Sequence, residues 1–179
     1  MKNIPGAKPF FLNKKKLNSD IKKILNNGIL SSGPHLKKFE NLFKKKTKVK
    51  FAAAVNSGGT ALEIALESLN IRNKEVIVPT QTFIATANSV IRAGGTPIFC
   101  DIDQKTGCVD LNSIKKKITK KTAGVVFVYM FGIIPKSVLD IKKYCKKKNI
   151  FLLEDASHAH GASIENYKIG SIGDLATFS

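Results

Sequence analysis

Residues 75–103 read EVIVPTQTFIATANSVIRAGGTPIFCDID, and this stretch decides the fold class. The apolar run Glu75–Val78 is typical of a buried strand, and Thr82–Ala93 carries apolar residues at helical spacing. The two glycines that follow stand where a helix ends and the chain turns into a second strand, Thr96–Asp101. A strand, a helix and another strand in this order predict a parallel pair of strands.

The same alternation continues on both sides of this unit. Four further strands are predicted at Phe51–Val55, Ala123–Tyr129, Ile150–Glu154 and Leu175–Phe178. Covering helices are predicted at Thr60–Asn70 and Val138–Lys147 because the apolar residues of each share one face. The runs GVVFVYMF and IFLLE are continuously apolar, as expected for strands buried on both faces. The sequence therefore predicts an α/β fold over residues 51–179, with a mostly parallel sheet flanked by helices.

A lysine-rich segment, residues 1–50, precedes this domain. It carries a net charge of +12, and residues 105–148 carry +10, against +17 for the whole chain. Helices are predicted in it at Ser19–Asn27 and at His35–Lys46, the second with Gly-Pro at its start. All but two of the 30 basic residues are lysine, which favours a solvated coat over the arginine forks of nucleic-acid recognition. A basic nucleic-acid-binding or structural fragment remains the alternative from another class.

Composition excludes several classes of protein. With 179 residues, 43% of them hydrophobic, and a mean hydropathy of −0.05, the chain is expected to bury a core. No apolar run approaches the ~18 residues of a membrane-spanning helix, and the N-terminus has no signal-peptide pattern, so a cytoplasmic protein without a membrane partner is expected. The three cysteines show no CxxC spacing and are expected to be free thiols.

Three segments that follow predicted strands carry candidate functional residues. The first, NSGGT at residues 56–60, opens a helix, and its backbone amides and the helix dipole suit a phosphate. A plain strand-to-helix turn is the alternative, since neither GxGxxG nor a P-loop motif is present. The second, EDASHAHG at residues 154–161, follows the most apolar strand, where ligands of open α/β sheets gather. There Asp155 could cap the next turn, and His158 and His160 could bind a metal.

The third segment, PTQTF at residues 79–83, ends with an aromatic ring. Phe83 could belong to the core, or a flat ligand could stack on it. A phosphate cradle, a stacking aromatic ring and a buried carboxylate, each at a strand end, together match what pyridoxal 5'-phosphate requires of a protein.

Six motifs follow one another along the chain: Ser32-Gly33-Pro34, Phe39-Glu40, VNSGGTALEIAL, EVIVPTQTFIATANSVIRAGGTPIFCDID, LLEDASHAHGA and GSIGDLATFS. In this order and at this spacing they resemble the DegT/DnrJ/StrS family of sugar aminotransferases, over essentially the whole chain. The resemblance implies the large domain of a pyridoxal-phosphate-dependent transferase of fold type I, like aspartate aminotransferase, here incomplete.

The resemblance also implies residues that bind the cofactor, and no metal. Gly59 and Thr60 would offer backbone amides to the phosphate, and Ser179 would bind the same phosphate. Gly59 replaces the threonine usual in the family, which removes a side chain but keeps the amide.

At the other end of the cofactor, Phe83 would stack on the pyridine ring and Asp155 would pair with the ring nitrogen. His158 stands where the family usually has a glutamine that faces the ring hydroxyl. Imidazole can make that hydrogen bond in either tautomer.

One part of the family pattern is missing. In the family a lysine follows the serine equivalent to Ser179 within about half a dozen residues and forms the Schiff base with the cofactor. No residue of this chain, Lys168 included, is assigned that catalytic role. The family's C-terminal small domain and the strand after the lysine are also absent, which would leave Phe51–Val55 with a bare edge. The isolated chain is therefore expected to be poorly stable, aggregation-prone and inactive.

The function implied by the resemblance is transfer of an amino group from an amino acid, with glutamate as the expected donor, to a nucleotide-linked keto-sugar, in polysaccharide biosynthesis. Its partners would be the nucleotide-sugar, the amino donor and a second subunit of a homodimer. Some relatives replace the lysine with histidine and act as sugar dehydratases on the same cofactor, and nothing before Ser179 separates the two reactions.

Overall fold

The computed structural model describes residues 10–179, which form two compact units, the first ending at Phe39 and the second running from Glu40 to Ser179. In the first unit, helix α1 (Lys14–Asn27) begins where the Asn13 side chain accepts the Lys16 amide at 2.9 Å. Helix α2 (Pro34–Thr47) starts in the first unit and ends in the second. Both predicted N-terminal helices are therefore confirmed, while the division into residues 1–50 and 51–179 stays a prediction.

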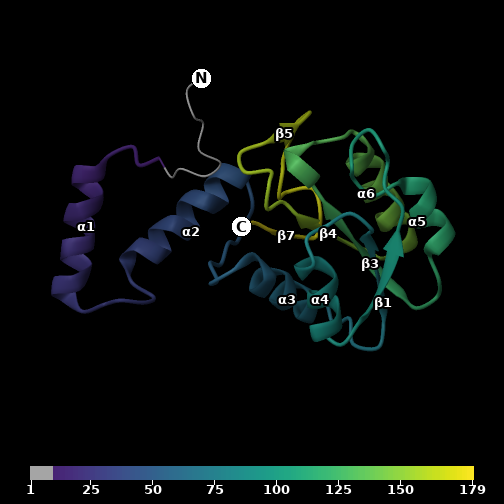
Figure 1. The fold of residues 1–179 in the computed structure, drawn as a ribbon, viewed down its shortest axis with the longest axis horizontal. Helices are drawn as coiled ribbons and strands as arrows, with labels where there is room; N and C mark the ends of the chain where they lie inside the picture. Colours follow the sequence, from purple (N-terminus) through teal and green to yellow (C-terminus); the bar gives the residue numbers. More distant parts are fainter. Residues whose placement is uncertain (1–9) are drawn as a thin grey trace, which may run out of the picture. The chain divides into compact units, whose positions relative to one another are not determined.

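Five parallel strands form the sheet of the second unit (Figure 1). They are β1 (Glu75–Pro79), β2 (Thr96–Cys100), β3 (Thr122–Val128), β4 (Phe151–Asp155) and β7 (Leu175–Thr177). Their order across the sheet is β2-β1-β3-β4-β7, and every pairing is parallel. Each of these strands ends within one residue of its prediction, so the α/β fold class is confirmed.

Helices cover both faces of the sheet because successive side chains of each strand point to opposite sides. On one face, Val76, Val126 and Leu153 pack with α3 (Gly58–Ser68) and α4 (Ala85–Arg92). On the other face, strand residues such as Ile77, Val125 and Phe127 pack with α5 (Leu111–Lys117) and α6 (Ser137–Lys148). The two core clusters follow from the unbroken apolar runs of the buried strands.

Four short elements were not predicted. Helix α5 begins where the Asp110 carboxylate accepts the Ser113 amide at 2.8 Å. A 3-10 turn, η1 (Met130–Gly132), follows β3, and β5 (Ser163–Ile164) pairs with β6 (Tyr167–Lys168) in a small antiparallel hairpin.

The prediction of a strand at Phe51–Val55 is wrong. This segment is not paired with any strand of residues 10–179, and the Ala54 amide donates instead to the Glu40 carboxylate at 2.9 Å. Phe51 is 87% exposed. An apolar segment becomes a strand only when another strand lies beside it, so the apolar pattern of this segment was not enough to predict a strand. Within residues 10–179 the edge strands of the sheet are β2 and β7, so the prediction of a bare edge at Phe51–Val55 is also wrong.

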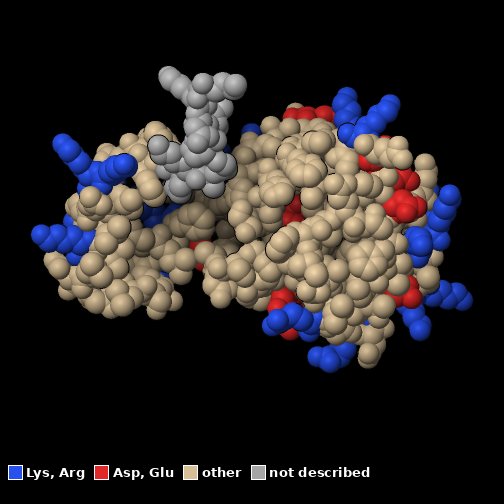
Figure 2. Space-filling view, viewed as in Figure 1, with Lys and Arg blue, Asp and Glu red and all other residues tan. Residues whose placement is uncertain are grey.

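The surface is rich in lysine, and Figure 2 shows the basic side chains of the second unit spread around the face in view, with acidic side chains between some of them. Within residues 10–179, no helix is both long and apolar enough to cross a membrane. All three cysteines are buried free thiols, as predicted.

Candidate cofactor site

Three segments meet at the carboxyl ends of the parallel strands. Helix α3 begins there, β1 leads into the loop that carries Phe83, and β4 ends at Asp155. The last residue, Ser179, follows β7 at the same edge of the sheet. Parallel strands end at one edge, so the fold brings together candidates that are far apart in sequence.

The start of α3 lies directly against Ser179. A Cβ placed on Gly58 would be 2.7 Å from the Ser179 Cβ and 2.9 Å from its Oγ, so any side chain there would have to displace Ser179. Ser57 caps the helix, and within residues 10–179 neither the Gly58 amide nor the Gly59 amide has a hydrogen-bond partner. Free amides at a helix N-terminus, beside a serine hydroxyl, form an anion site that fits a phosphate.

The backbone amides predicted to bind the phosphate differ in whether they already donate a hydrogen bond. The Thr60 amide already donates to Ser57 Oγ at 3.1 Å, whereas the Gly59 amide is free. A Cβ on Gly59 would meet its nearest neighbour, Ala85 Cβ, at 3.8 Å, an ordinary contact, so the site has room for the family's usual threonine. Sequence reasoning missed Gly58, although a serine cap followed by two glycines was visible as a signal.

Asp155 is 6% exposed at the end of β4. Its Oδ1 accepts the Ser157 hydroxyl at 2.7 Å and the Ser157 amide at 3.3 Å, and its Oδ2 accepts the Thr86 hydroxyl at 3.3 Å. It makes no ion pair with any side chain of residues 10–179. A cation would offset the charge of a buried carboxylate, so this one fits a protonated pyridine nitrogen.

Phe83 lies in the loop between β1 and α4 and is 74% exposed. Its carbonyl accepts the Thr86 amide at 3.0 Å, which fixes the loop next to the hydroxyl that reaches Asp155. The ring has no aromatic neighbour within the described part of the chain. An exposed ring at this place is free to stack on a flat ligand, and the alternative of a core residue does not hold.

The turn η1 holds His158. The Phe131 amide donates to His158 Nδ1 at 3.3 Å, and the two rings stack with centroids 6.4 Å apart and planes 15° apart. Phe131 reaches this position in a left-handed conformation, with φ 55°. With Nδ1 accepting, the neutral imidazole carries its proton on Nε2, which can donate to a ligand oxygen.

The other histidine of this segment takes a different direction. His160 packs edge-on against Phe178, with centroids 5.2 Å apart, and near Phe43 at 6.3 Å. Over residues 10–179, no three His, Cys, Asp or Glu side chains gather in a way that could hold a metal ion. His158 and His160 therefore contact two separate aromatic groups.

Glu154, beside Asp155, is fully buried and was not predicted as a site residue. Its carboxylate accepts the Tyr129 hydroxyl at 2.5 Å and three backbone amides. Those amides belong to Gly170, Ile172 and Gly173, at 3.1, 2.8 and 2.7 Å. Burial, and the nearby Glu154 carboxylate, raise the pKa of Tyr129 above its usual value, so the hydroxyl keeps the proton it donates. Four donors satisfy this carboxylate, which makes it a structural group.

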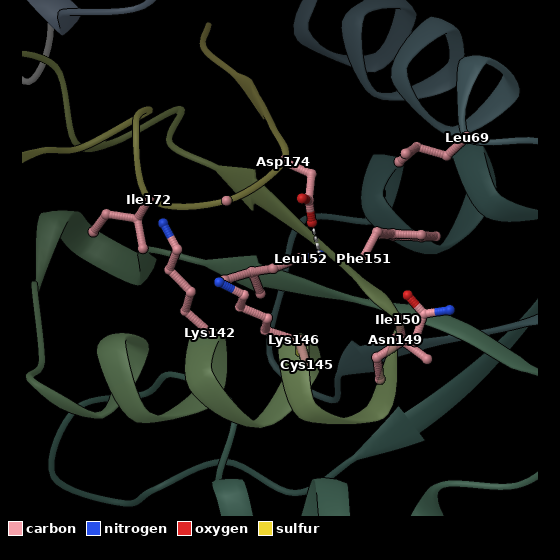
Figure 3. A pocket seen from close by; sticks show the side chains of 11 residues that line it. Leu69, Lys142, Cys145, Lys146, Asn149, Ile150, Phe151, Leu152, Ile172 and Asp174 are labelled. Atoms are coloured by element: carbon pink, nitrogen blue, oxygen red, sulfur yellow. Dashed lines mark hydrogen bonds between the residues drawn. The ribbon is translucent and has the colours of Figure 1, made fainter.

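A groove lies at the opposite end of β4 (Figure 3). Lys142, Cys145 and Lys146 of α6 line one side of it, and Asp174 accepts the Leu152 amide at 2.8 Å on the other. Four residues of extended chain, about 13 Å, separate the amino end of β4 from Asp155. The groove is thus distinct from the candidate cofactor site.

Comparisons with known proteins found relatives that cover essentially the whole chain. GDP-perosamine synthase of Escherichia coli O157:H7 is 37% identical over 181 residues, covering 100% of this chain and 49% of that protein. PseC of Helicobacter pylori, an aminotransferase involved in the biosynthesis of pseudoaminic acid, superposes with a TM-score of 0.89 at 29% identity, covering 99% of this chain and 48% of that one. Spr1654 of Streptococcus pneumoniae, solved in its PMP form, gives a TM-score of 0.90 at 27% identity, covering 99% and 48%.

The chain spans about half the length of the curated relatives it matches. Residues 12–179 match the domain shared by the DegT/DnrJ/EryC1/StrS aminotransferases. The sequence, the parallel sheet and the relatives therefore agree, and the chain belongs to the DegT/DnrJ/EryC1/StrS aminotransferase family.

Proposed function

We propose that the protein is an aminotransferase dependent on pyridoxal 5'-phosphate, the cofactor of its family. In its reaction an amino group passes from an amino acid, for which we propose glutamate, to a nucleotide-linked keto-sugar. The similar proteins include a GDP-perosamine synthase and a UDP-sugar transaminase, which supports a nucleotide-sugar acceptor. We further propose that the protein acts as a cytoplasmic homodimer.

The observation that carries this proposal is the buried Asp155 carboxylate. It has hydroxyl and amide donors but no cation in residues 10–179, and it lies at the same sheet edge as the free amides of α3. A cofactor with a protonated ring nitrogen at one end and a phosphate at the other supplies both missing partners. When bound, its ring supplies a sink for the electrons of the substrate carbon.

Different residues of the chain would bind different parts of the cofactor. Asp155 would hold the proton on the ring nitrogen, and the Gly58 and Gly59 amides with Ser179 would fix the phosphate. We propose that Thr60 joins them by exchanging its bond to Ser57. Phe83 would cover one ring face, and His158 would donate from Nε2 to the ring oxygen because Phe131 holds its Nδ1.

The lysine that completes such a site is not among residues 1–179, so we propose that these residues bind cofactor without catalysing transfer. Lys168, the one lysine after residue 148, is paired with Ser163 in the β5–β6 hairpin. Pyridoxamine 5'-phosphate is the suitable probe, since its binding needs no covalent bond to lysine.

Titration with pyridoxamine 5'-phosphate, followed by its fluorescence, tests the proposal. Asp155→Asn keeps the shape of the side chain but removes its charge, and we expect it to weaken binding by about tenfold or more. The control is Asp140→Asn, which removes a carboxylate that is 61% exposed on α6 and should leave affinity unchanged. Equal affinity for the unchanged protein and Asp155→Asn would refute the proposed site.

A further inference from the structure

One helix contacts both ends of the candidate cofactor site. The hydroxyl of Thr86 in α4 donates to Asp155 Oδ2 at 3.3 Å, and the hydroxyl of Ser89, one turn later, donates to the Gly59 carbonyl at 3.2 Å. Thr86 is 0% exposed and Ser89 is 3% exposed. Two buried hydroxyls of one short helix thus touch the carboxylate at the ring end and the turn at the phosphate end.

Thr86 belongs to a directed chain of hydrogen bonds. Its oxygen lies 2.7 Å from the Thr82 hydroxyl and 3.3 Å from Asp155 Oδ2. A threonine hydroxyl has one proton, and a carboxylate can only accept it, so Thr86 donates to Asp155 and accepts from Thr82. Together with Ser157 on Oδ1, this chain fixes the plane of the carboxylate.

Ser89 acts on the first turn of α3. Its proton goes to the carbonyl of Gly59, the residue whose amide is free for a phosphate. A Cβ on Gly59 would meet Ala85, one turn earlier in α4, at 3.8 Å, so α4 packs closely along this turn. Three residues of helix separate the two hydroxyls, a rise of about 4.5 Å along the axis.

We propose that α4 sets the distance between the ring-binding carboxylate and the phosphate-binding turn, with Thr86 and Ser89 as positioning residues. Thr86 orients Asp155 toward the ring nitrogen, and Ser89, through the Gly59 carbonyl, holds the first turn of α3 in place for the phosphate. Neither residue touches the cofactor. This inference rests on the proposed function, because it needs a ligand that occupies both ends.

Two ligands separate the two roles. Pyridoxamine 5'-phosphate uses both ends of the site, whereas pyridoxamine lacks the phosphate. We expect Thr86→Val to weaken both ligands by the same factor, about fivefold to thirtyfold, since it disturbs only the ring end. We expect Ser89→Ala to weaken pyridoxamine 5'-phosphate by about threefold to tenfold and to leave pyridoxamine unchanged.

Controls distinguish positioning from packing. Thr86→Ser restores the hydroxyl and should bind both ligands within about twofold of the unchanged protein. Ser113→Ala removes another buried serine hydroxyl, on the opposite face of the sheet, and should change neither affinity. If Thr86→Val does not fold, Thr82→Val, at a half-buried position, should give the same pattern with a smaller loss.

Each result has a definite reading. Binding of pyridoxamine 5'-phosphate by the unchanged protein, with unchanged affinities in both variants, would overturn this inference and leave the proposed function intact. Equal weakening of both ligands by Thr86→Val and Ser89→Ala, or failure of Thr86→Ser to restore binding, would likewise overturn this inference and leave the proposed function intact. No binding by the unchanged protein would overturn the proposed cofactor site and this inference with it.

Discussion

Gly58 and Ser179 lie against each other although they are far apart in the sequence, Gly58 opening helix α3 and Ser179 following β7. A Cβ on Gly58 would stand 2.7 Å from the Ser179 Cβ, closer than side chains approach. We predict that Gly58→Ala pushes Ser179 away from the helix start and weakens binding of pyridoxamine 5'-phosphate by about tenfold. Because Ser179 is exposed at the chain end, the free energy of unfolding should fall by less than about 1 kcal/mol.

The matched control is the next residue. Gly59→Ala would place its Cβ 3.8 Å from Ala85, so binding should stay within about threefold of the unchanged protein. Isothermal titration of both variants measures the difference, and equal losses in the two would show that the contact with Ser179 does not matter.

Substitution of Glu154 should damage the fold and not the ligand site. Glu154→Gln replaces two accepting oxygens with one, and at least one of its four donors then meets an amide nitrogen. We expect a loss of about 3 kcal/mol in the free energy of unfolding by urea, with about 1 kcal/mol for Tyr129→Phe. Glu67→Gln, at an exposed position of α3, should stay within about 0.5 kcal/mol, and a similar value for Glu154→Gln would contradict the structural role.

The pH dependence of stability should reveal the buried thiol of Cys145. Burial raises its pKa from 9.0 to about 12, so between these values the unfolded chain loses the proton while the native chain keeps it. Stability from this group is complete below pH 9 and declines as pH rises toward 12. Compared with Cys145→Ala, the unchanged protein should lose about 1.4 kcal/mol of unfolding free energy per pH unit in that window, measured by urea denaturation. A constant difference between the two proteins would contradict the assignment.

The open edge at β7 should drive association of residues 1–179. Leu175 is 37% exposed on this three-residue strand, which among residues 10–179 pairs with β4 alone. We expect Leu175→Lys to slow aggregation severalfold in light scattering, because a charged side chain blocks strand addition. Ile91→Lys adds the same charge at a position of α4 that is 58% exposed, and should slow it less. Equal slowing by both variants would point to net charge and not to the edge.

The local pattern of apolar residues was sufficient to predict the strands that are buried on both faces of the sheet. The strands at Glu75–Pro79 and Phe151–Asp155 lie in unbroken apolar runs between helices, and their positions could be read from sequence. Phe51–Val55 carries a similar apolar signal but lacks a neighbouring strand, and pairing is a long-range property that no local pattern contains.

Candidate site residues could be proposed from sequence where a residue type suggests its own chemistry, as with Asp155, Phe83 and Gly59. Gly58, Thr86 and Ser89 were not found because their significance lies in contacts with residues 30 or more positions away. A buried threonine or serine in a helix has no distinctive sequence signal until its acceptor is known.

Glu154 and Asp155 are adjacent on one strand, but alternate residues of a strand face opposite sides of the sheet. Glu154 therefore binds buried backbone amides, whereas Asp155 lies at the candidate cofactor site. Deletion or insertion of a single residue within β4 would exchange these faces, placing a carboxylate among apolar side chains and leaving four donors without an acceptor. Length variation among related sequences should therefore avoid this strand altogether and fall in the loops around it. The contacts of these two neighbouring acids, Glu154 with its four donors and Asp155 with the ligand edge, thus fix which residues of β4 face each side of the sheet.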